Sequence, residues 1–236
     1  MTQPVIEASN VVKYLGSGPG RVAALRGVSL SLSGGELVLL MGPSGSGKTT
    51  LLSVLGCMLT PTSGTVRLLG QATSGVPPEK LADLRRRHVG FIFQSYHLFP
   101  TLTVVENVRL ALEMGGERAW RAHDKAVAAL TTVGLAHKIN AFPSHLSSGE
   151  QQRVAIARAI VGNTAAVLAD EPTAALDSAN GHAIMSLLSR IAKDPSRTVL
   201  VVTHDPRVLP FADRIVQIED GRLIETPQAP QKLLGT

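Results

Sequence analysis

The sequence predicts an α/β fold in which a mixed sheet of buried strands is flanked by helices. Short apolar runs at residues 37–41, 89–93, 165–169 and 198–202 alternate with helical segments, as buried parallel strands do. The residues after the first run form a glycine-rich turn that leads into an apolar helix. The chain is 44% hydrophobic but only 3% aromatic. We therefore expect an aliphatic core of Leu, Val, Ile and Ala.

The glycine-rich turn has the spacing of a phosphate-binding P-loop. Its residues are Gly42, Pro43, Ser44, Gly45, Ser46, Gly47, Lys48, Thr49 and Thr50. Glycines allow backbone N–H groups to face inward, and the following helix N-terminus attracts anions. In such a loop Lys48 reaches the β- and γ-phosphates, and the hydroxyl of Thr49 coordinates Mg²⁺. A chance Gly/Ser-rich loop is the alternative, but the flanking strand and helix favour binding of a nucleoside triphosphate.

The N-terminal part is expected to be antiparallel. Residues 5–12 read as an edge strand with Tyr14 directly after it, and a turn-rich loop follows at 16–20. Residues 28–32 alternate apolar and polar side chains, and residues 65–70 form another strand. These segments predict a small antiparallel β part near residues 1–35 beside the main sheet.

The middle of the chain changes to a helical pattern. A helix is expected over residues 77–87, before the strand at 89–93 that ends at Gln94. From there to about residue 160, Ala- and Leu-rich segments are interrupted by Gly and Pro. We interpret residues 95–160 as a helical subdomain inserted into one α/β domain, whose core comprises residues 1–94 and 161–225.

The α/β pattern then resumes to the end of the core. A helix is predicted at residues 178–192, between the last two buried strands, and a hairpin at 215–224. The Pro- and Gln-containing residues 226–236 are expected to form a tail.

Composition limits the possible function classes. The net charge is +5, but the densest basic run, residues 85–87, ends a predicted helix, where basic side chains are common. A solvated face is the first interpretation, proximity to anionic lipid the second and nucleic acid a distant third.

We find no signal-peptide pattern and no apolar stretch long enough for a membrane span. The single cysteine, Cys57, is expected to be a core residue on the helix after the P-loop. These features predict a cytoplasmic protein.

Polar residues follow three of the buried strands. Asp170 and Glu171 end the strand near 165–169, His204 follows the strand at 198–202, and Gln94 follows the strand at 89–93. Ligands of open α/β sheets bind at the carboxyl ends of strands. Asp170 is expected to hold Mg²⁺, and Glu171 to orient or deprotonate the attacking water. Each residue also has a non-functional interpretation. Asp170 and Glu171 can be an acidic turn, His204 a solvated histidine and Gln94 a strand cap.

A second small-residue turn opens a helix at residues 146–153, which read Leu-Ser-Ser-Gly-Glu-Gln-Gln-Arg. Ser147 followed three residues later by Glu150 is a capping-box pattern. A helix N-terminus of this kind also binds anions. Because the P-loop already holds the phosphates of one nucleotide, this turn suits a second nucleotide.

Taken together, these motifs resemble the nucleotide-binding subunit of ATP-binding-cassette (ABC) transporters over essentially the whole chain. The resemblance implies a P-loop NTPase core and a head-to-tail homodimer with two ATP molecules between the subunits. It also implies that Tyr14 stacks on adenine, that Glu171 is the catalytic base and that His204 links Glu171 to the γ-phosphate. The turn of Ser147, Ser148, Gly149 and Glu150 then acts on the partner's ATP. Asp177 communicates across the dimer, and Thr49, Gln94 and Asp170 hold Mg²⁺.

One position departs from the usual signature of the family, Leu-Ser-Gly-Gly followed by Gln or Glu. Ser148 replaces the first glycine, which weakens the expected contact across the dimer if that position needs a positive φ. Residues 84–108 look like the branch of macrolide exporters, lipoprotein-release systems, heterocyst-glycolipid exporters and the division-associated cassette. Residues 94–100, including Tyr96 and Phe99, are expected near a groove that receives a permease helix, or else in the subdomain core.

Two classes of function remain after this reading. The first is an ATPase on the cytoplasmic face of the membrane that powers a separate permease, with export or lipid extraction favoured because the chain ends soon after His204. The second is an ABC ATPase of a non-transport complex, either a division-type membrane system or one associated with nucleic acid or the ribosome. A kinase-type P-loop enzyme would leave the signature unexplained. We expect no nucleic-acid partner.

Overall fold

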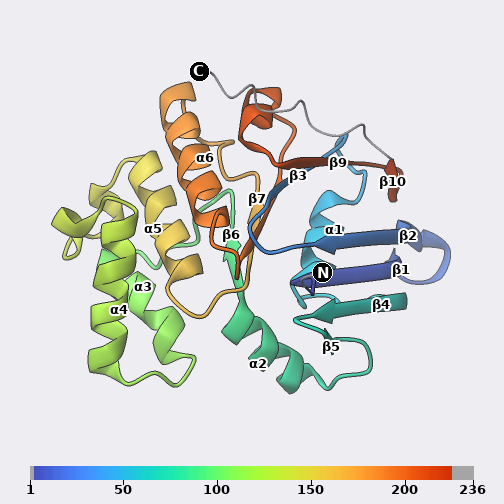
Figure 1. The fold of residues 1–236 in the computed structure, drawn as a ribbon, viewed down its shortest axis with the longest axis horizontal. Coiled ribbons are helices and arrows are strands. Elements are labelled where there is room, and N and C mark those ends of the chain that lie inside the picture. Colours follow the sequence, from blue (N-terminus) through green and yellow to red (C-terminus); the bar gives the residue numbers. More distant parts are fainter. Residues whose placement is uncertain (1–2, 225–236) are drawn as a thin grey trace.

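The larger sheet carries the strand ends on which the site is built. The computed structural model describes residues 3–224. Six strands lie in the order β10 (Arg222–Ile224), β9 (Arg214–Glu219), β3 (Leu37–Met41), β8 (Thr198–Val202), β7 (Ala166–Asp170) and β6 (Val89–Ile92). All neighbours are parallel except the β9–β10 hairpin. The four apolar runs are therefore strands, as predicted, and their carboxyl ends lie along one edge of the sheet (Figure 1).

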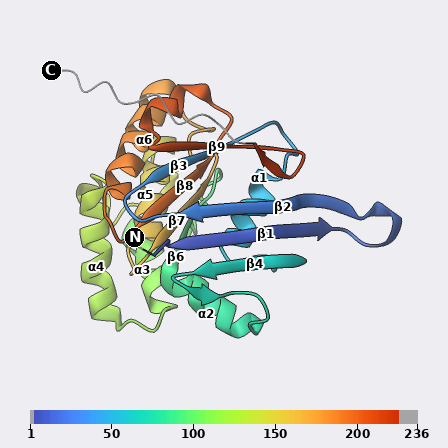
Figure 2. The same ribbon diagram turned by 45° about the vertical axis from the view of Figure 1, so that its right-hand side comes forward.

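The smaller sheet is antiparallel and lies beside the P-loop helix (Figures 1 and 2). Its order is β2 (Val22–Leu32), β1 (Ile6–Leu15), β4 (Ser63–Leu68) and β5 (Gln71–Ala72). Both strands of the first hairpin are longer than predicted: β1 includes Tyr14, and β2 begins at Val22 rather than at residue 28. Their extensions are largely exposed apart from the buried Leu25 and contain register shifts, so they lack the clear alternation that marks a half-buried strand.

Helices cover both faces of the larger sheet. The P-loop helix α1 (Lys48–Leu55) and the antiparallel sheet lie on one side, and α2 (Pro78–His88) leads into β6. On the other side α6 (Ser178–Ala192) packs beside a layer of α3 (Val104–Glu113), α4 (Ala119–Thr132) and α5 (Ser148–Ile160), as Figure 2 shows. Short 3₁₀ helices η1 (Gly18–Gly20), η2 (Ala136–Lys138), η3 (Pro143–His145) and η4 (Pro206–Phe211) connect these elements.

Alternation along the buried strands divides the core between the two faces. On β3, Leu37 and Leu39 belong to the cluster under α3–α6, whereas Val38 and Leu40 belong to the cluster under α1 and the antiparallel sheet. All four side chains are fully buried. A strand with period-two side chains that is buried on both faces has to be apolar throughout, which explains the uninterrupted apolar runs.

Cys57 differs from its predicted position. It lies just beyond α1 with a φ of 58°, so it belongs to the turn after the helix and not to the helix itself. The side chain is buried, as expected, and burial raises the pKa of the thiol to about 11. Such a thiol is almost entirely protonated at neutral pH and therefore a poor nucleophile.

No helix within residues 3–224 has both the length and the hydropathy needed to cross a bilayer.

Candidate functional site

The P-loop requires glycine at two positions because the backbone passes very close to other strands. At Gly42 (φ 156°), a Cβ atom would lie 2.1 Å from the carbonyl oxygen of Ile218. At Gly47 (φ 104°), a Cβ atom would lie 2.5 Å from the carbonyl oxygen of Ala24 on β2. Both backbone conformations disfavour residues with a side chain. The loop is thus fixed between the two sheets, with Ser44 and Gly45 exposed at its tip.

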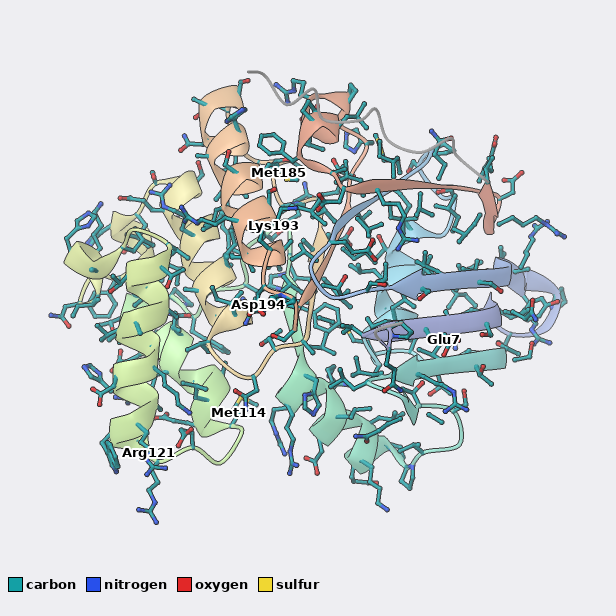
Figure 3. The ribbon with its side chains drawn as sticks, in the orientation of Figure 1. Glu7, Met114, Arg121, Met185, Lys193 and Asp194 are labelled. Carbon is teal, nitrogen blue, oxygen red and sulfur yellow. The ribbon has the colours of Figure 1, made fainter. Side chains whose placement is uncertain are left out.

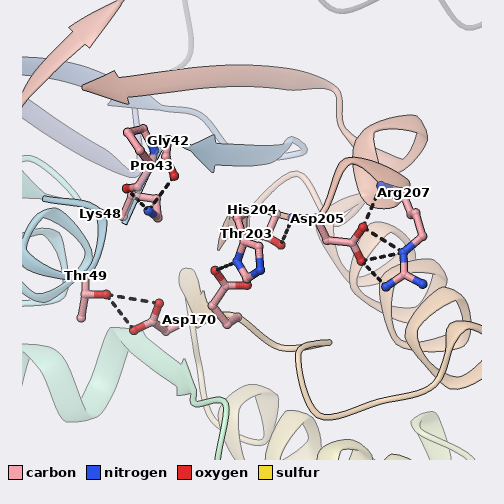
Figure 4. A network of polar contacts seen from close by, with 10 residues as sticks. Gly42, Pro43, Lys48, Thr49, Asp170, Thr203, His204, Asp205 and Arg207 are labelled. Carbon is pink, nitrogen blue, oxygen red and sulfur yellow. Dashed lines mark hydrogen bonds and ion pairs between the residues drawn. The ribbon is translucent and has the colours of Figure 1, made fainter. Parts of the chain in front are cut away.

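Polar groups of the P-loop remain available to bind an anion. Gly47 caps α1 without a side-chain hydrogen bond, and the buried hydroxyl of Ser46 has no partner in the described part of the chain. Lys48 bends back over the loop, and its Nζ donates to the carbonyl oxygens of Gly42 (2.8 Å) and Pro43 (2.7 Å), as Figure 4 shows. Phosphate oxygens are stronger acceptors than neutral carbonyls. The residues present therefore fit a bound triphosphate.

Thr49 and Asp170 meet across the ends of α1 and β7. The Thr49 hydroxyl donates to Asp170 Oδ2 at 3.2 Å (Figure 4). Burial raises the pKa of Asp170 above its usual value of 3.8, with the Thr49 hydrogen bond acting in the opposite direction. A partly desolvated carboxylate beside a hydroxyl is a hard oxygen donor set that suits Mg²⁺. These two residues fit the cation that the sequence predicts.

Glu171 and His204 form the second pair of the site. His204 Nδ1 lies 2.6 Å from Glu171 Oε1, and the Glu171 side chain is only 17% exposed, compared with 73% for His204. Glu171 has a positive φ of 48°, and its backbone N–H donates to the Val202 carbonyl oxygen on β8. Non-glycine residues held in this conformation cost free energy and are concentrated at functional sites. The turn after β7 thus aims the carboxylate at the end of the neighbouring strand.

Gln94 lies in an exposed turn after β6, and within residues 3–224 no hydrogen bond joins its side chain to Asp170 or Thr49. The next residues of this turn are strained, because Tyr96 and His97 have φ values of 59° and 49°. Arg158 on α5 holds the turn by donating to the carbonyl oxygens of Tyr96 (2.7 Å) and His97 (2.5 Å). Sequence reasoning did not identify Arg158, because an arginine inside an amphipathic helix carries no distinguishing signal.

Tyr14 lies on β1 near the P-loop and is 40% exposed. It pairs with Ala23 on β2, and the next residue, Ala24, is the one that approaches Gly47. The guanidinium carbon of Arg21 lies 4.0 Å from the centre of the Tyr14 ring, which is cation–π distance. The ring is placed where a stacking platform for the predicted nucleotide would be useful.

The signature turn begins α5 as a complete capping box. The Ser147 hydroxyl accepts from the Glu150 backbone N–H, and Glu150 accepts from the Ser147 N–H. Ser148 is exposed at the first position of the helix, and it is not among the described residues with positive φ. The serine therefore fits the helical backbone without strain. Lys138 and the Ser147 N–H hold the pKa of Glu150 below its usual value.

Asp177 and Asn180 link the signature turn to α6. Asp177 caps α6, and its carboxylate accepts from both the backbone N–H (2.9 Å) and the side-chain amide (2.7 Å) of Asn180. A Cβ atom at Gly149 would lie 2.6 Å from Asn180 Oδ1, so the signature glycine is required for this contact. The sequence analysis predicted a role for Asp177 but none for Asn180, whose contacts depend on how the helices pack.

Within residues 3–224, no hydrogen bond or ion pair joins the signature turn to the P-loop. One chain thus brings together the P-loop, Asp170, Glu171 and His204 but leaves the signature separate.

The chain is similar to known proteins over most of its length. A family model described as "ABC transporter" matches residues 25–174. Among curated proteins, the macrolide export ATP-binding/permease protein MacB of Salmonella choleraesuis is 43% identical over 97% of this chain. MacB of Nitrobacter winogradskyi is 45% identical over 99% of the chain. The chain spans about a third of the length of these relatives (35% and 36%).

Solved structures of the bacterial ABC transporter cassette MJ0796 are also similar. A dimeric post-hydrolysis state bound to ADP and Pi, and a further dimeric structure, each have a TM-score of 0.86 and 39% sequence identity. Each match covers 95% of this chain and 99% of the MJ0796 chain. The predicted fold class is confirmed by this similarity.

Proposed function

The chain belongs to the ABC transporter family, and we propose that it is a cassette that binds and hydrolyses ATP to drive a membrane permease. The observation that carries the proposal is the pairing of Thr49 with Asp170 and of Glu171 with His204 at adjacent strand ends beside the P-loop. This arrangement provides a phosphate cradle, a cation site and a base along one edge of the sheet. MacB, as an export ATP-binding/permease protein, supports export as the direction of transport.

Nucleotide binding is assigned to the P-loop and β1. Phosphate oxygens would accept from the N–H groups of residues 42–50 and from Lys48, which would exchange its carbonyl partners for charged ones. Tyr14 would stack on the adenine. Thr49 and Asp170, with Gln94, would hold Mg²⁺, which neutralises charge on the phosphate oxygens when bound.

Hydrolysis is assigned to Glu171. Its carboxylate would accept a proton from water as the water oxygen bonds to the γ-phosphorus and the bond to the ADP oxygen breaks. His204 holds Glu171 Oε1 at 2.6 Å and so fixes the orientation of the base. Because His204 is largely exposed, its ring also remains accessible to the γ-phosphate.

A second subunit would complete each site. The signature residues Ser147, Ser148, Gly149 and Glu150 begin α5 without contacting the P-loop of the same described chain. In a head-to-tail homodimer, this helix N-terminus would face the γ-phosphate held by the partner. Asp177 would lie at the interface, and the dimeric MJ0796 structures support this arrangement.

The same proposal covers organisation and location. Residues 1–94 and 161–225 would form the core of a single cassette, with residues 95–160 as its helical subdomain and 226–236 as a tail. The turn at 94–100 would contact the permease, which would place the cassette at the cytoplasmic face of the membrane. Residues 225–236 lie outside the described residues.

The test is ATP turnover by the wild-type chain and three variants. Glu171→Gln should bind ATP but lose at least about 100-fold in hydrolysis, the usual effect of removing a general base. Lys48→Ala should lose ATP binding. Glu79→Gln, which removes an exposed carboxylate on α2, is the control and should behave as wild type. Near-wild-type hydrolysis by Glu171→Gln would refute the assignment of the base.

A further inference from the structure

The loop between β1 and β2 has a built conformation that the proposed function does not explain. Gly16 has a φ of 78°, and a Cβ atom there would lie 3.0 Å from the carbonyl oxygen of Gly20. Pro19 lies in the 3₁₀ turn η1, where its fixed φ suits a helical backbone. The N–H of Arg21 closes this turn by donating to the carbonyl oxygen of Gly18 at 3.2 Å. The loop therefore determines where the Arg21 side chain starts.

Arg21 lies over the ring of Tyr14, and the guanidinium carbon is 4.0 Å from the ring centre. Tyr14 pairs with Ala23, which follows Arg21 by two residues, so the two side chains lie on the same face of the sheet. The pair lies towards the loop end of the hairpin, whereas Glu7, labelled in Figure 3, lies near the start of β1. Within residues 3–224 no hydrogen bond or ion pair involves the guanidinium, so the ring is the group that holds it.

Ring surface of Tyr14 remains open to a ligand. The residue is 40% exposed although Arg21 covers part of the ring. The strand beneath the ring is fixed by the segment before β4. The Tyr14 N–H donates to Thr62 Oγ1 at 3.1 Å, and Lys13 Nζ donates to the carbonyl oxygen of Thr60 at 2.6 Å. An aromatic ring has two faces, so a cation on one face leaves the other for a base.

We propose that Arg21 is a positioning residue for nucleotide binding, which holds the Tyr14 ring in the orientation that stacks on the base. This inference rests on the proposed function and adds a residue to its base-binding site. A ring that is already fixed loses less rotamer freedom when the base binds, and such preorganisation increases affinity. A cation–π pair at an exposed site changes an equilibrium by roughly two- to fivefold.

The proposal predicts an effect on binding and not on the bond that breaks. The base lies at the opposite end of the nucleotide from the γ-phosphate. Stacking on the base is therefore equal in the ground state and the transition state, and its loss raises KM without lowering kcat. Inorganic tripolyphosphate has no base, so its binding should not depend on Arg21. A substitution that merely disturbed the fold would weaken both ligands.

The experiment compares the wild-type chain with Arg21→Ala, Arg21→Lys and Arg67→Ala, each with Tyr14 kept or replaced by alanine. Arg67 is an exposed arginine of the same sheet that donates to a backbone carbonyl, which makes it the matched control. ATP hydrolysis gives kcat and KM, and inhibition by tripolyphosphate gives its affinity. The chain has two tyrosines, Tyr14 and Tyr96, so NMR of carbon-13-labelled tyrosine follows the Tyr14 ring during ATP titration without turnover.

We expect Arg21→Ala to raise KM for ATP roughly two- to fivefold with kcat unchanged, and to shift the ring signals of Tyr14 but not those of Tyr96. Arg21→Lys keeps the cation and should recover part of the affinity, while Arg67→Ala should match the wild type. In the Tyr14→Ala background, Arg21→Ala should have no further effect, because the ring through which it acts is gone.

Several results would overturn the inference. An unchanged KM for Arg21→Ala would show that the pair has no role in binding, and a lower KM would show that Arg21 covers the surface that the base uses. Weaker inhibition by tripolyphosphate, or an effect that persists in Tyr14→Ala, would show that Arg21 acts on something other than the ring. Absence of ATP hydrolysis by the wild type would refute the proposed function instead. The ATP titration of the Tyr14 signals would then decide the inference, which requires weaker binding by Arg21→Ala.

Discussion

At the scale of single residues, the site keeps several features that oppose stability. Asp170 is a partly desolvated carboxylate, Glu171 has a positive φ, and the buried hydroxyl of Ser46 has no partner within the described chain. Each feature costs free energy in the folded state. The proposed function offers a ligand for each: a cation for Asp170, the γ-phosphate and water for Glu171, and phosphate for the P-loop.

The cost at Asp170 can be measured by replacing its carboxylate. Because burial raises the folded-state pKa, the charged form is less favourable in the folded state than in the unfolded state. Asp170→Asn removes that charge and keeps an oxygen that can accept from Thr49. We expect the free energy of unfolding at pH 7 to rise by about 1 kcal/mol at most, while hydrolysis falls steeply.

The effect of Asp170→Asn on the free energy of unfolding should depend on pH. Stability associated with neutral Asp170 is present below the usual pKa of 3.8 and is lost as pH rises through the higher folded-state pKa. The advantage of Asp170→Asn should therefore be full at pH 7 and should shrink towards pH 3 in urea titrations. An advantage that grows as the pH falls would contradict the account.

The sequence analysis located the candidate residues of the site more readily than the residues that contact them. Lys48, Thr49, Asp170, Glu171 and His204 follow strands or a recognisable loop, so their approximate positions can be deduced from the order of the elements. Arg21, Arg158 and Asn180 could not be found in this way. Their contacts with Tyr14, with the turn after Gln94 and with Gly149 depend on how helices and strands pack.

At the scale of elements, the P-loop combines glycines with different requirements. Gly42 is confined by the backbone of β9, whereas a Cβ atom at Gly45 would meet nothing within 4 Å. Gly45 nevertheless has a φ of 78°, which a residue with a side chain adopts at some cost. Substitutions at these two positions therefore distinguish the effect of a steric clash from the effect of an unfavourable backbone conformation.

Alanine at each glycine tests this distinction. Gly42→Ala should displace the loop or β9 and abolish ATP binding, with a loss of stability of about 3 kcal/mol or more. Gly45→Ala should cost only about 1 kcal/mol, because it adds strain without a clash. Thermal unfolding and ATP titration of both variants provide the measurement. Equal effects at the two positions would refute the steric explanation.

The limits of the parallel strands were easier to predict than the limits of the two hairpin strands. The parallel strands β3, β7 and β8 are buried on both faces, so each appears as a short apolar run with clear limits. The β1–β2 hairpin extends into solvent with register shifts, which hides its true length. The two-residue strand β5 is exposed and too short to leave any pattern.

At the scale of the whole molecule, the two features that we propose bind nucleotide lie apart in one chain. The P-loop begins α1 on one side of the sheet, and the signature begins α5 in the helical layer. Asn180 ties the signature to Asp177, and Arg158 ties the same helix to the turn after Gln94. These contacts connect the helix that begins with the signature both to α6 and to the turn after Gln94.

The central claim is that ATP joins two chains by binding between the P-loop of one and the signature of the other. Light scattering of Glu171→Gln measures this directly, since the variant should bind ATP without consuming it. With Mg-ATP we predict a mass of about twice the 24.9 kDa of one chain, and with Mg-ADP the mass of a single chain. Adding Ser147→Arg, which blocks the signature, should keep the ATP-bound protein monomeric. A Glu171→Gln chain that is saturated with Mg-ATP and remains a monomer would contradict the account.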